Sequence, residues 1–101
     1  MSEPARPEIT VTREDDEHRY AARVDGALAG FVAYDLDGDA VALTHTEVDP
    51  AFEGKGVGGA LARAALDDIR SGGDRRVVPV CPFIKAWIAR HPDYEELVVS
   101  S

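Results

Sequence analysis

The stretch Asp49–Leu61, with the sequence DPAFEGKGVGGAL, decides the fold of this chain. It separates a segment of strand character, residues 40–48, from a segment with helical periodicity that continues to about Arg70. Glycines allow the backbone of such a loop to approach a ligand closely, and the first turn of the following helix leaves amide groups unpaired. The helix dipole adds partial positive charge at the same point. A glycine-rich loop between a strand and a helix is therefore typical of a phosphate-binding site.

The size and composition of the chain are those of one globular domain. It has 101 residues, 45% of them hydrophobic, and a net charge of -8, which argues against nucleic-acid binding through a basic patch. Cys81 is the one cysteine, so an internal disulfide is excluded and a cytoplasmic location is expected. No apolar run approaches the roughly 20 residues of a membrane span. We expect residues 1–8 to form a flexible tail without a signal peptide and residues 9–99 to form the domain, with no metal, membrane or nucleic-acid partner.

The first half of the chain predicts an antiparallel meander. Alternating apolar and polar residues predict four strands, at residues 9–13, 18–24, 28–35 and 40–48. Hairpin signals separate the later strands, at residues 25–26 and 36–39. Strict alternation in the fourth strand places side chains on two faces. One face is predicted to carry Leu43, His45 and Glu47, and the other Thr44, Thr46 and Val48.

The second half predicts a helix, a strand and a second helix. Apolar residues recur at helical spacing between Val57 and Ile69, and glycines follow at residues 72–73. Residues 76–80 predict a fifth strand and residues 83–90 a second helix, with Pro82 near its first turn. A strand, a helix and a strand in succession imply that strands four and five run parallel. The predicted fold class is mixed α+β, a meander of about four strands followed by β-α-β-α.

Two familiar nucleotide motifs can be compared with the glycine loop. The P-loop pattern, Gly-x-x-x-x-Gly-Lys-Ser/Thr, does not occur in this sequence. The dinucleotide pattern Gly-x-Gly-x-x-Gly occurs at Gly54, Gly56 and Gly59. A dinucleotide-binding fold, however, opens with a βαβ unit and needs more strands than this chain supplies after its meander. The sequence therefore disfavours, without excluding, a dinucleotide site.

A third pattern fits the loop better. The segment 48–50 followed by residues 54–58 resembles the coenzyme A loop of the GNAT-type N-acetyltransferases, which reads Arg/Gln-x-x-Gly-x-Gly/Ala and binds pyrophosphate through backbone amides. Gly56 and Gly58 match the two small positions, whereas Glu53 stands where Arg or Gln is usual. Segments 45–48 and 81–94 resemble the small single-domain branch typified by N-acetyltransferase domain-containing protein 1. The resemblance covers roughly residues 28–98.

This resemblance implies a GNAT-like fold in which strands four and five splay apart and the pantetheine arm of acetyl-CoA enters between them. Acetyl-CoA would then be the co-substrate. The residues that the resemblance implies for coenzyme binding are Val48, Gly54, Lys55, Gly56, Val57, Gly58 and Gly59.

Three side chains are candidates for catalysis. An amine acceptor is protonated at neutral pH, so a base is useful, and His45 is the stronger candidate because an imidazole exchanges protons near neutrality. Glu47, two residues along the strand, could orient it, attract the cationic amine or relay the proton through water. Cys81 offers a second route, because the branch carries a cysteine here that could accept the acetyl group first. Direct transfer and an acetyl-cysteine intermediate both remain open, and so do structural roles for each residue.

The sequence therefore predicts an acetyl-CoA-dependent N-acetyltransferase that acts on a primary amine. The acceptor is left open between a protein lysine, an N-terminus and a small amine. A different class remains as the alternative, an acyl-CoA-binding module or adaptor with little turnover, which the position of Glu53 favours.

Overall fold

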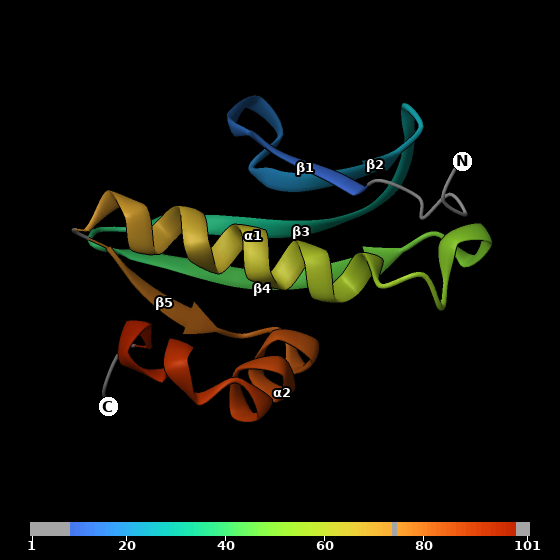
Figure 1. Ribbon diagram of the computed structural model, residues 1–101. Helices are drawn as coiled ribbons and strands as arrows, with labels where there is room; N and C mark the ends of the chain where they lie inside the picture. Colours follow the sequence, from blue (N-terminus) through green and yellow to red (C-terminus); the bar gives the residue numbers. More distant parts are fainter. Residues whose placement is uncertain (1–8, 74, 99–101) are drawn as a thin grey trace.

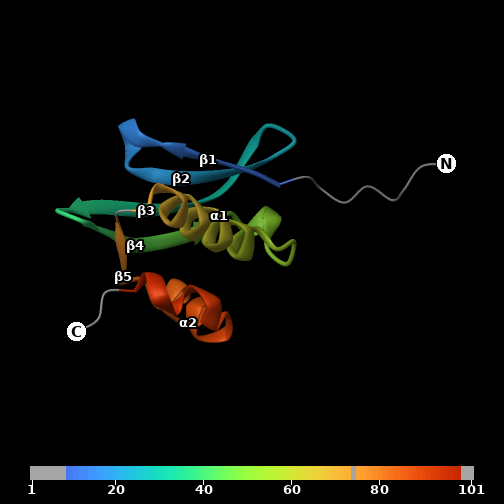
Figure 2. The same cartoon turned by 60° about the vertical axis from the view of Figure 1, so that its left-hand side comes forward.

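The computed structural model describes residues 9–73 and 75–98, so the predicted tail at residues 1–8 and the predicted end of the domain at residue 99 lie outside the described residues. A five-stranded sheet carries α1 across it, and α2 lies beside the strand at one edge (Figures 1 and 2). The elements are β1 (Ile9–Glu14), η1 (Asp15–Glu17), β2 (Arg19–Val24), β3 (Ala27–Asp37), β4 (Ala40–Val48), η2 (Pro50–Phe52), α1 (Val57–Gly72), β5 (Arg76–Pro79), α2 (Pro82–Arg90) and η3 (Pro92–Leu97).

The strands lie in the order β1-β2-β3-β4-β5, antiparallel from β1 to β4 and parallel between β4 and β5. The predicted mixed α+β fold with parallel fourth and fifth strands is therefore confirmed. β5 pairs only with the first four residues of β4, from Ala40 opposite Arg76 to Leu43 opposite Pro79. Beyond this point β4 continues to Val48 while β5 diverges from it (Figure 1), which is the predicted splay.

Pro79 explains where the pairing ends. A proline has no amide N–H to donate and is tolerated only at the margin of a ladder. The chain turns directly after it, where the Val80 amide donates to the Val78 carbonyl at 3.0 Å. One further bond, from the Cys81 amide to the Leu43 carbonyl at 2.9 Å, fixes the start of α2 against β4.

A β-bulge reverses the faces of β4. The pairing of β3 with β4 shifts register so that Thr44 has no residue opposite it. Leu43, before the bulge, is fully buried, whereas the side chains of His45 and Glu47 are 59% and 65% exposed. The prediction that these three residues share one face is wrong, because one extra residue inverts the alternation on which it depended.

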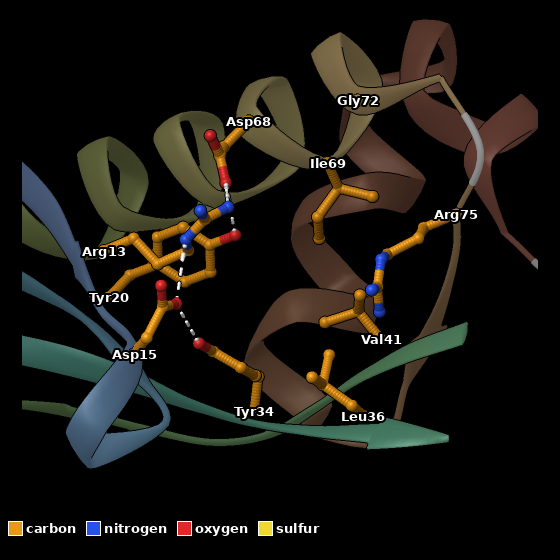
Figure 3. A pocket seen from close by; sticks show the side chains of 10 residues that line it. All are labelled: Arg13, Asp15, Tyr20, Tyr34, Leu36, Val41, Asp68, Ile69, Gly72 and Arg75. Carbon is orange, nitrogen blue, oxygen red and sulfur yellow. Dashed lines mark hydrogen bonds and ion pairs between the residues drawn. The ribbon is translucent and has the colours of Figure 1, made fainter. Parts of the chain in front are cut away.

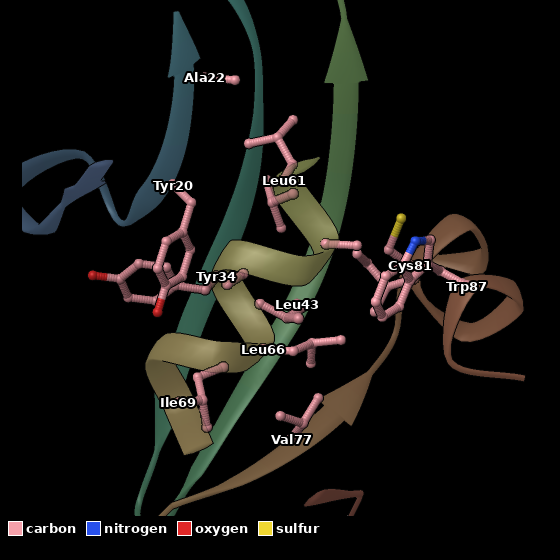
Figure 4. Close-up of a cluster of buried hydrophobic side chains, with 14 of the residues drawn as sticks. Tyr20, Ala22, Tyr34, Leu43, Leu61, Leu66, Ile69, Val77, Cys81 and Trp87 are labelled. Atoms are coloured by element: carbon pink, nitrogen blue, oxygen red, sulfur yellow. The ribbon is translucent and has the colours of Figure 1, made fainter. Parts of the chain in front are cut away.

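A single hydrophobic core joins the sheet to both helices (Figure 4). The buried side chains of α1 are the apolar residues that recur at helical spacing in the sequence, so its predicted inner face is confirmed. From α2 the core receives Ile84, Trp87 and Ile88. Among the described residues, no helix is long and apolar enough to cross a membrane.

A polar network closes the core where the C-terminal half of α1 meets β1, β2 and β3 (Figure 3). The Arg13 guanidinium binds Asp15 at 2.9 Å and Asp68 at 2.8 Å, Tyr20 donates to Asp68, and Tyr34 donates to Asp15. Burial, with the bond to Asp15, raises the pKa of Tyr34 to about 12, so its hydroxyl remains a donor at neutral pH. The hollow beside this network, about 280 Å³, lies at the opposite end of α1 from the glycine loop.

The close approach of β3 to β4 at Gly30 provides a test of the fold. A Cβ at this position would lie 2.6 Å from the Glu47 carbonyl oxygen, and a backbone atom cannot rotate away. We expect Gly30→Ala to lower the free energy of unfolding by about 1–3 kcal/mol, the usual cost of overpacking. Urea unfolding followed by circular dichroism measures the change.

Gly59→Ala is the matched control for this substitution. Its Cβ would lie 3.7 Å from Trp87 Nε1, an ordinary contact, and alanine favours a helix over glycine. We expect this variant to keep or raise the stability. Equal stability of Gly30→Ala and the unmodified chain would contradict the packing of β3 on β4.

Candidate active site

The glycine loop begins in a turn that its own residues stabilise. The Asp49 carboxylate accepts from the Ala51 amide at 2.9 Å and opens η2, which ends where the Glu53 amide donates to the Pro50 carbonyl. Gly54 and Gly56 then have φ angles of 82° and 84°. A residue with a Cβ is strained in this region. The two glycines are therefore what allows the chain to pass from η2 into α1.

The start of α1 presents amides without helical partners. Gly56 is its N-cap, and the first amide with a carbonyl acceptor is that of Ala60, which donates to Gly56 at 3.0 Å. The amides of Val57, Gly58 and Gly59 precede it and, as at any helix N-terminus, have no acceptor within the helix. Together with the helix dipole they form a site suited to a phosphate or pyrophosphate.

Gly58 has a second role, which is to let α2 pack against the start of α1. A Cβ at Gly58 would lie 2.9 Å from the ring of Phe83, whereas one at Gly59 would make only an ordinary contact with Trp87, at 3.7 Å. Arg63 of α1 lies over the Trp87 ring at 5.5 Å. The start of α1 and the first turn of α2 are thereby held next to each other.

Cys81 is the N-cap of α2 and is 5% exposed. Its sulfur lies 3.3 Å from the Thr46 hydroxyl oxygen. Burial raises the pKa of the Cys81 thiol. Hydrogen bonds from the Thr46 hydroxyl and from the backbone amides of Ile84, Phe83 and Thr46 lower the pKa by more than burial raises it, so the Cys81 pKa lies below its ordinary value. A thiol at a helix N-terminus with donors around it is disposed to act as a nucleophile.

The unpaired end of β4 supplies another donor. The Asp49 amide donates to the Ala29 carbonyl of β3 at 2.8 Å. Because successive amides of a strand point to opposite sides, the Val48 amide points to the side that β5 has left. It is therefore available to donate to a ligand carbonyl oxygen on that side of the strand.

His45 and Glu47 lie together on the other face of the sheet. The His45 Nε2 and Glu47 Oε2 atoms are 3.6 Å apart, and the His45 ring lies 6.0 Å from the ring of Phe31. The predicted site residues thus form two groups, the loop with Val48 and Cys81 in one, and the His45–Glu47 pair in the other. The side chain of β4 that reaches the Cys81 sulfur is that of Thr46, which sequence analysis did not identify.

The described residues contain no cluster of side chains that could bind a metal ion. Within residues 9–73 and 75–98, no three His, Cys, Asp or Glu side chains gather in a way that could hold a metal ion.

In a comparison with protein families, residues 19–97 match the family described as GCN5-related N-acetyl-transferase. A comparison with curated protein sequences found no match.

Solved structures with the same fold are also found. A GCN5-like protein from Staphylococcus aureus superposes with a TM-score of 0.67 at 19% identity, over 97% of this chain and 93% of that one. The ribosomal-protein-alanine N-acetyltransferase from Brucella melitensis biovar Abortus 2308 superposes with a TM-score of 0.56 at 27% identity. That match covers 82% of this chain and 62% of the Brucella chain.

The contact between Thr46 and Cys81 predicts a change in thiol reactivity. Thr46→Val removes the hydroxyl that lowers the Cys81 pKa, so the pKa rises and less thiolate is present at neutral pH. We expect the pH midpoint of Cys81 alkylation by iodoacetamide to move upward. The readout is specific, because the chain has one cysteine.

Two other substitutions complete this test. Thr46→Ser keeps the hydroxyl and is expected to keep the midpoint. Thr44→Val removes a hydroxyl of the same strand whose partner is the Ala33 carbonyl, and it too is expected to leave the midpoint unchanged. A midpoint that is the same in all four proteins would show that Thr46 does not act on the thiol.

Proposed function

This chain belongs to the GCN5-related N-acetyltransferase family, and on that premise we propose that it moves the acetyl group of acetyl-CoA to a primary amine. The observation that carries the proposal is that the start of α1 and the end of β4 beyond its pairing with β5 both lie next to the start of α2, where Gly58 approaches Phe83 and Thr46 lies 3.3 Å from the Cys81 sulfur. A molecule with a pyrophosphate at one end and a thioester at the other fits this arrangement.

The coenzyme would bind by its pyrophosphate to the amides between Gly54 and Gly59, with Lys55 contributing a positive charge. Its pantetheine arm would lie in the gap between β4 and α2. The thioester carbonyl would then accept from the Val48 amide, which stabilises the negative charge that develops on oxygen during acyl transfer. Binding thus uses backbone donors along the whole coenzyme.

In the direct route, the amine nitrogen attacks the thioester carbon, a C–N bond forms, and the C–S bond breaks to release the coenzyme thiolate. The ammonium proton must leave before attack, and the His45–Glu47 pair is the proposed acceptor. The thiolate of the coenzyme is then protonated by solvent. The net products are the N-acetylated amine, free coenzyme A and one proton.

In the acetyl-cysteine route, the Cys81 thiolate attacks the same carbon and the coenzyme thiolate leaves, so one thioester is exchanged for another. The amine then attacks acetyl-Cys81, and the cysteine thiolate is regenerated. The donors around the Cys81 sulfur and its lowered pKa support this route.

Loop geometry provides the first test of coenzyme binding. Gly56→Ala adds a Cβ at a φ of 84°, which strains the loop and misaligns its amides. We expect its affinity for acetyl-CoA to fall at least about tenfold, the loss of one or two good hydrogen bonds. Isothermal titration calorimetry measures the affinity.

Gly38→Ala is the matched control, because Gly38 also has a positive φ, 59°, and open space around it, but lies in the turn between β3 and β4. We expect its acetyl-CoA affinity to be unchanged. If the unmodified chain gives no heat with acetyl-CoA, the proposed function is wrong.

Mass spectrometry distinguishes the two routes and the non-catalytic alternative. After incubation with acetyl-CoA alone, the acetyl-cysteine route predicts an added mass of about 42 Da on Cys81, and Cys81→Ala then abolishes transfer to an amine. The direct route predicts no added mass and activity in Cys81→Ala. Tight acetyl-CoA binding with no added mass and no coenzyme release with any amine would instead identify a coenzyme-binding module, which the exposed acid Glu53 in the loop favours.

A further inference from the structure

Two hollows flank the C-terminal end of α1, at the other end of this helix from the glycine loop. The first, of about 280 Å³, lies beside the polar network of Arg13 (Figure 3). The second, of about 350 Å³, lies between the end of α1, the start of β5 and η3. Ile69 and Arg75 line both hollows. The two therefore adjoin each other at these side chains, so one ligand can extend from the first hollow into the second.

An apolar wall faces the polar network across the first hollow. It consists of the buried Val41 and Ile69 together with Leu36, which is 53% exposed. In Figure 3 these three side chains lie with Arg75 on one side of the hollow, and Arg13 with its partners lies on the other. An apolar group that covered this wall would remove the exposed leucine from water and gain free energy by binding.

The second hollow gathers positive charge. Its lining includes three exposed arginines, Arg70, Arg75 and Arg76, against the single carboxylate of Glu96. Arg70 donates to the Asp93 carbonyl at 2.7 Å and Arg76 to the Glu96 carbonyl at 3.2 Å, and these bonds hold two of the guanidinium groups in place. The Glu96 carboxylate is 80% exposed and lies 3.8 Å from Arg70. One loosely held carboxylate does not neutralise three arginines, although the chain as a whole has a net charge of -8.

Arg75 is the cation that the apolar wall and the arginine cluster share. Within residues 9–73 and 75–98, ion pairs form at four arginines, and Arg75 is not among them. Asp39 lies close by, since its carbonyl accepts from the Arg76 amide at 2.9 Å, but it lines neither hollow. A guanidinium group in this position is suited to a carboxylate, which it can bind through two parallel hydrogen bonds.

We propose that the two hollows together bind a small carboxylic acid with an apolar body. Its carboxylate binds Arg75 and Arg76, and its apolar body covers the wall of the first hollow. No step of acetyl transfer uses this site, so it is a second binding site, independent of the proposed function. The charge excludes amines as ligands, and the apolar wall favours larger acids over acetate.

Three probes test the site on the full chain. 3-Phenylpropionate and phenethylamine carry the same ring and arm with opposite charges, and acetate carries the carboxylate alone. In ¹⁵N-labelled protein, we expect 3-phenylpropionate to shift the backbone signals of residues 36, 41, 69–73 and 75–77, with saturation in the millimolar range that so small a ligand allows. We expect phenethylamine to leave these signals in place and acetate to bind more weakly. No saturable shift with 3-phenylpropionate, or equal affinity for any two of the probes, would overturn the proposal.

Substitutions of exposed residues identify the groups responsible. Arg75→Gln is expected to weaken 3-phenylpropionate binding by about threefold to fivefold, as for an exposed ion pair. Arg90→Gln is the matched control, because Arg90 is an exposed arginine of α2 that lines neither hollow, and it is expected to leave binding unchanged. Equal affinity in the two variants would contradict the assignment of the carboxylate to Arg75.

The apolar half has its own pair of variants. Leu36→Asn makes the exposed edge of the wall polar and is expected to weaken binding by about threefold, the loss of a partly buried aliphatic contact. Leu28→Asn changes the other exposed leucine of β3, which lines neither hollow, and is expected to have no effect. If Leu36→Asn binds as tightly as Leu28→Asn, the apolar body does not occupy the first hollow.

The outcome for this site is separable from that for the proposed function. Gly56→Ala, which alters the glycine loop at the opposite end of α1, is expected to leave 3-phenylpropionate binding unchanged, and Arg75→Gln is expected to leave acetyl-CoA binding unchanged. A loss of 3-phenylpropionate binding in Gly56→Ala would show that the probe binds at the glycine loop, and the second site would then be wrong.

Discussion

The interruption of one parallel ladder organises this molecule. β5 pairs with β4 for four residues and stops at Pro79, which has no amide to continue the bonding. The chain then turns, attaches the Cys81 amide to the Leu43 carbonyl and starts α2 beside the unpaired half of β4. Because β4 does not end where β5 leaves it, the Val48 amide is left without a strand partner on that side. The divergence of β5 from β4 therefore follows from backbone chemistry at a single residue.

Close packing between the two helices brings the start of α2 to the glycine loop. Gly58 has an ordinary helical φ, so what it contributes is the absent side chain, which allows the Phe83 ring to approach α1. Gly54 and Gly56 contribute conformational freedom at positive φ instead. The glycine-rich motif thus meets two physical requirements, a left-handed turn before the helix and a close contact at its first turn.

Much of this arrangement could be predicted from the sequence, because alternation and helical periodicity report burial on one side of an element. The bounds of β4 and the inner face of α1 were predicted correctly for this reason. The bulge at Thr44 was not predicted. One inserted residue leaves the composition and the local sequence pattern of a strand unchanged, so a bulge becomes visible only in the pairing of β4 with β3. The same bulge explains why Thr46 was missed as the partner of Cys81. The predicted parallel pairing already indicated that Cys81, at the end of strand five, lies beside strand four. Which side chain of strand four faces the Cys81 sulfur, however, depends on the register between β3 and β4.

The bulge also makes β4 a divider between two chemical environments. On one side lies Cys81, 5% exposed and surrounded by donors, and on the other lies the His45–Glu47 pair, more than half exposed. An acyl group needs protection from water, whereas an ammonium ion must reach a base that can pass its proton to solvent. Burial, which makes most cysteines inert, would protect an acetyl-cysteine from hydrolysis, and the surrounding donors offset its unfavourable effect on the thiolate. In the proposed reaction the two groups of candidate residues would therefore have separate tasks, with acyl chemistry on the Cys81 side of the strand and proton transfer on the His45–Glu47 side.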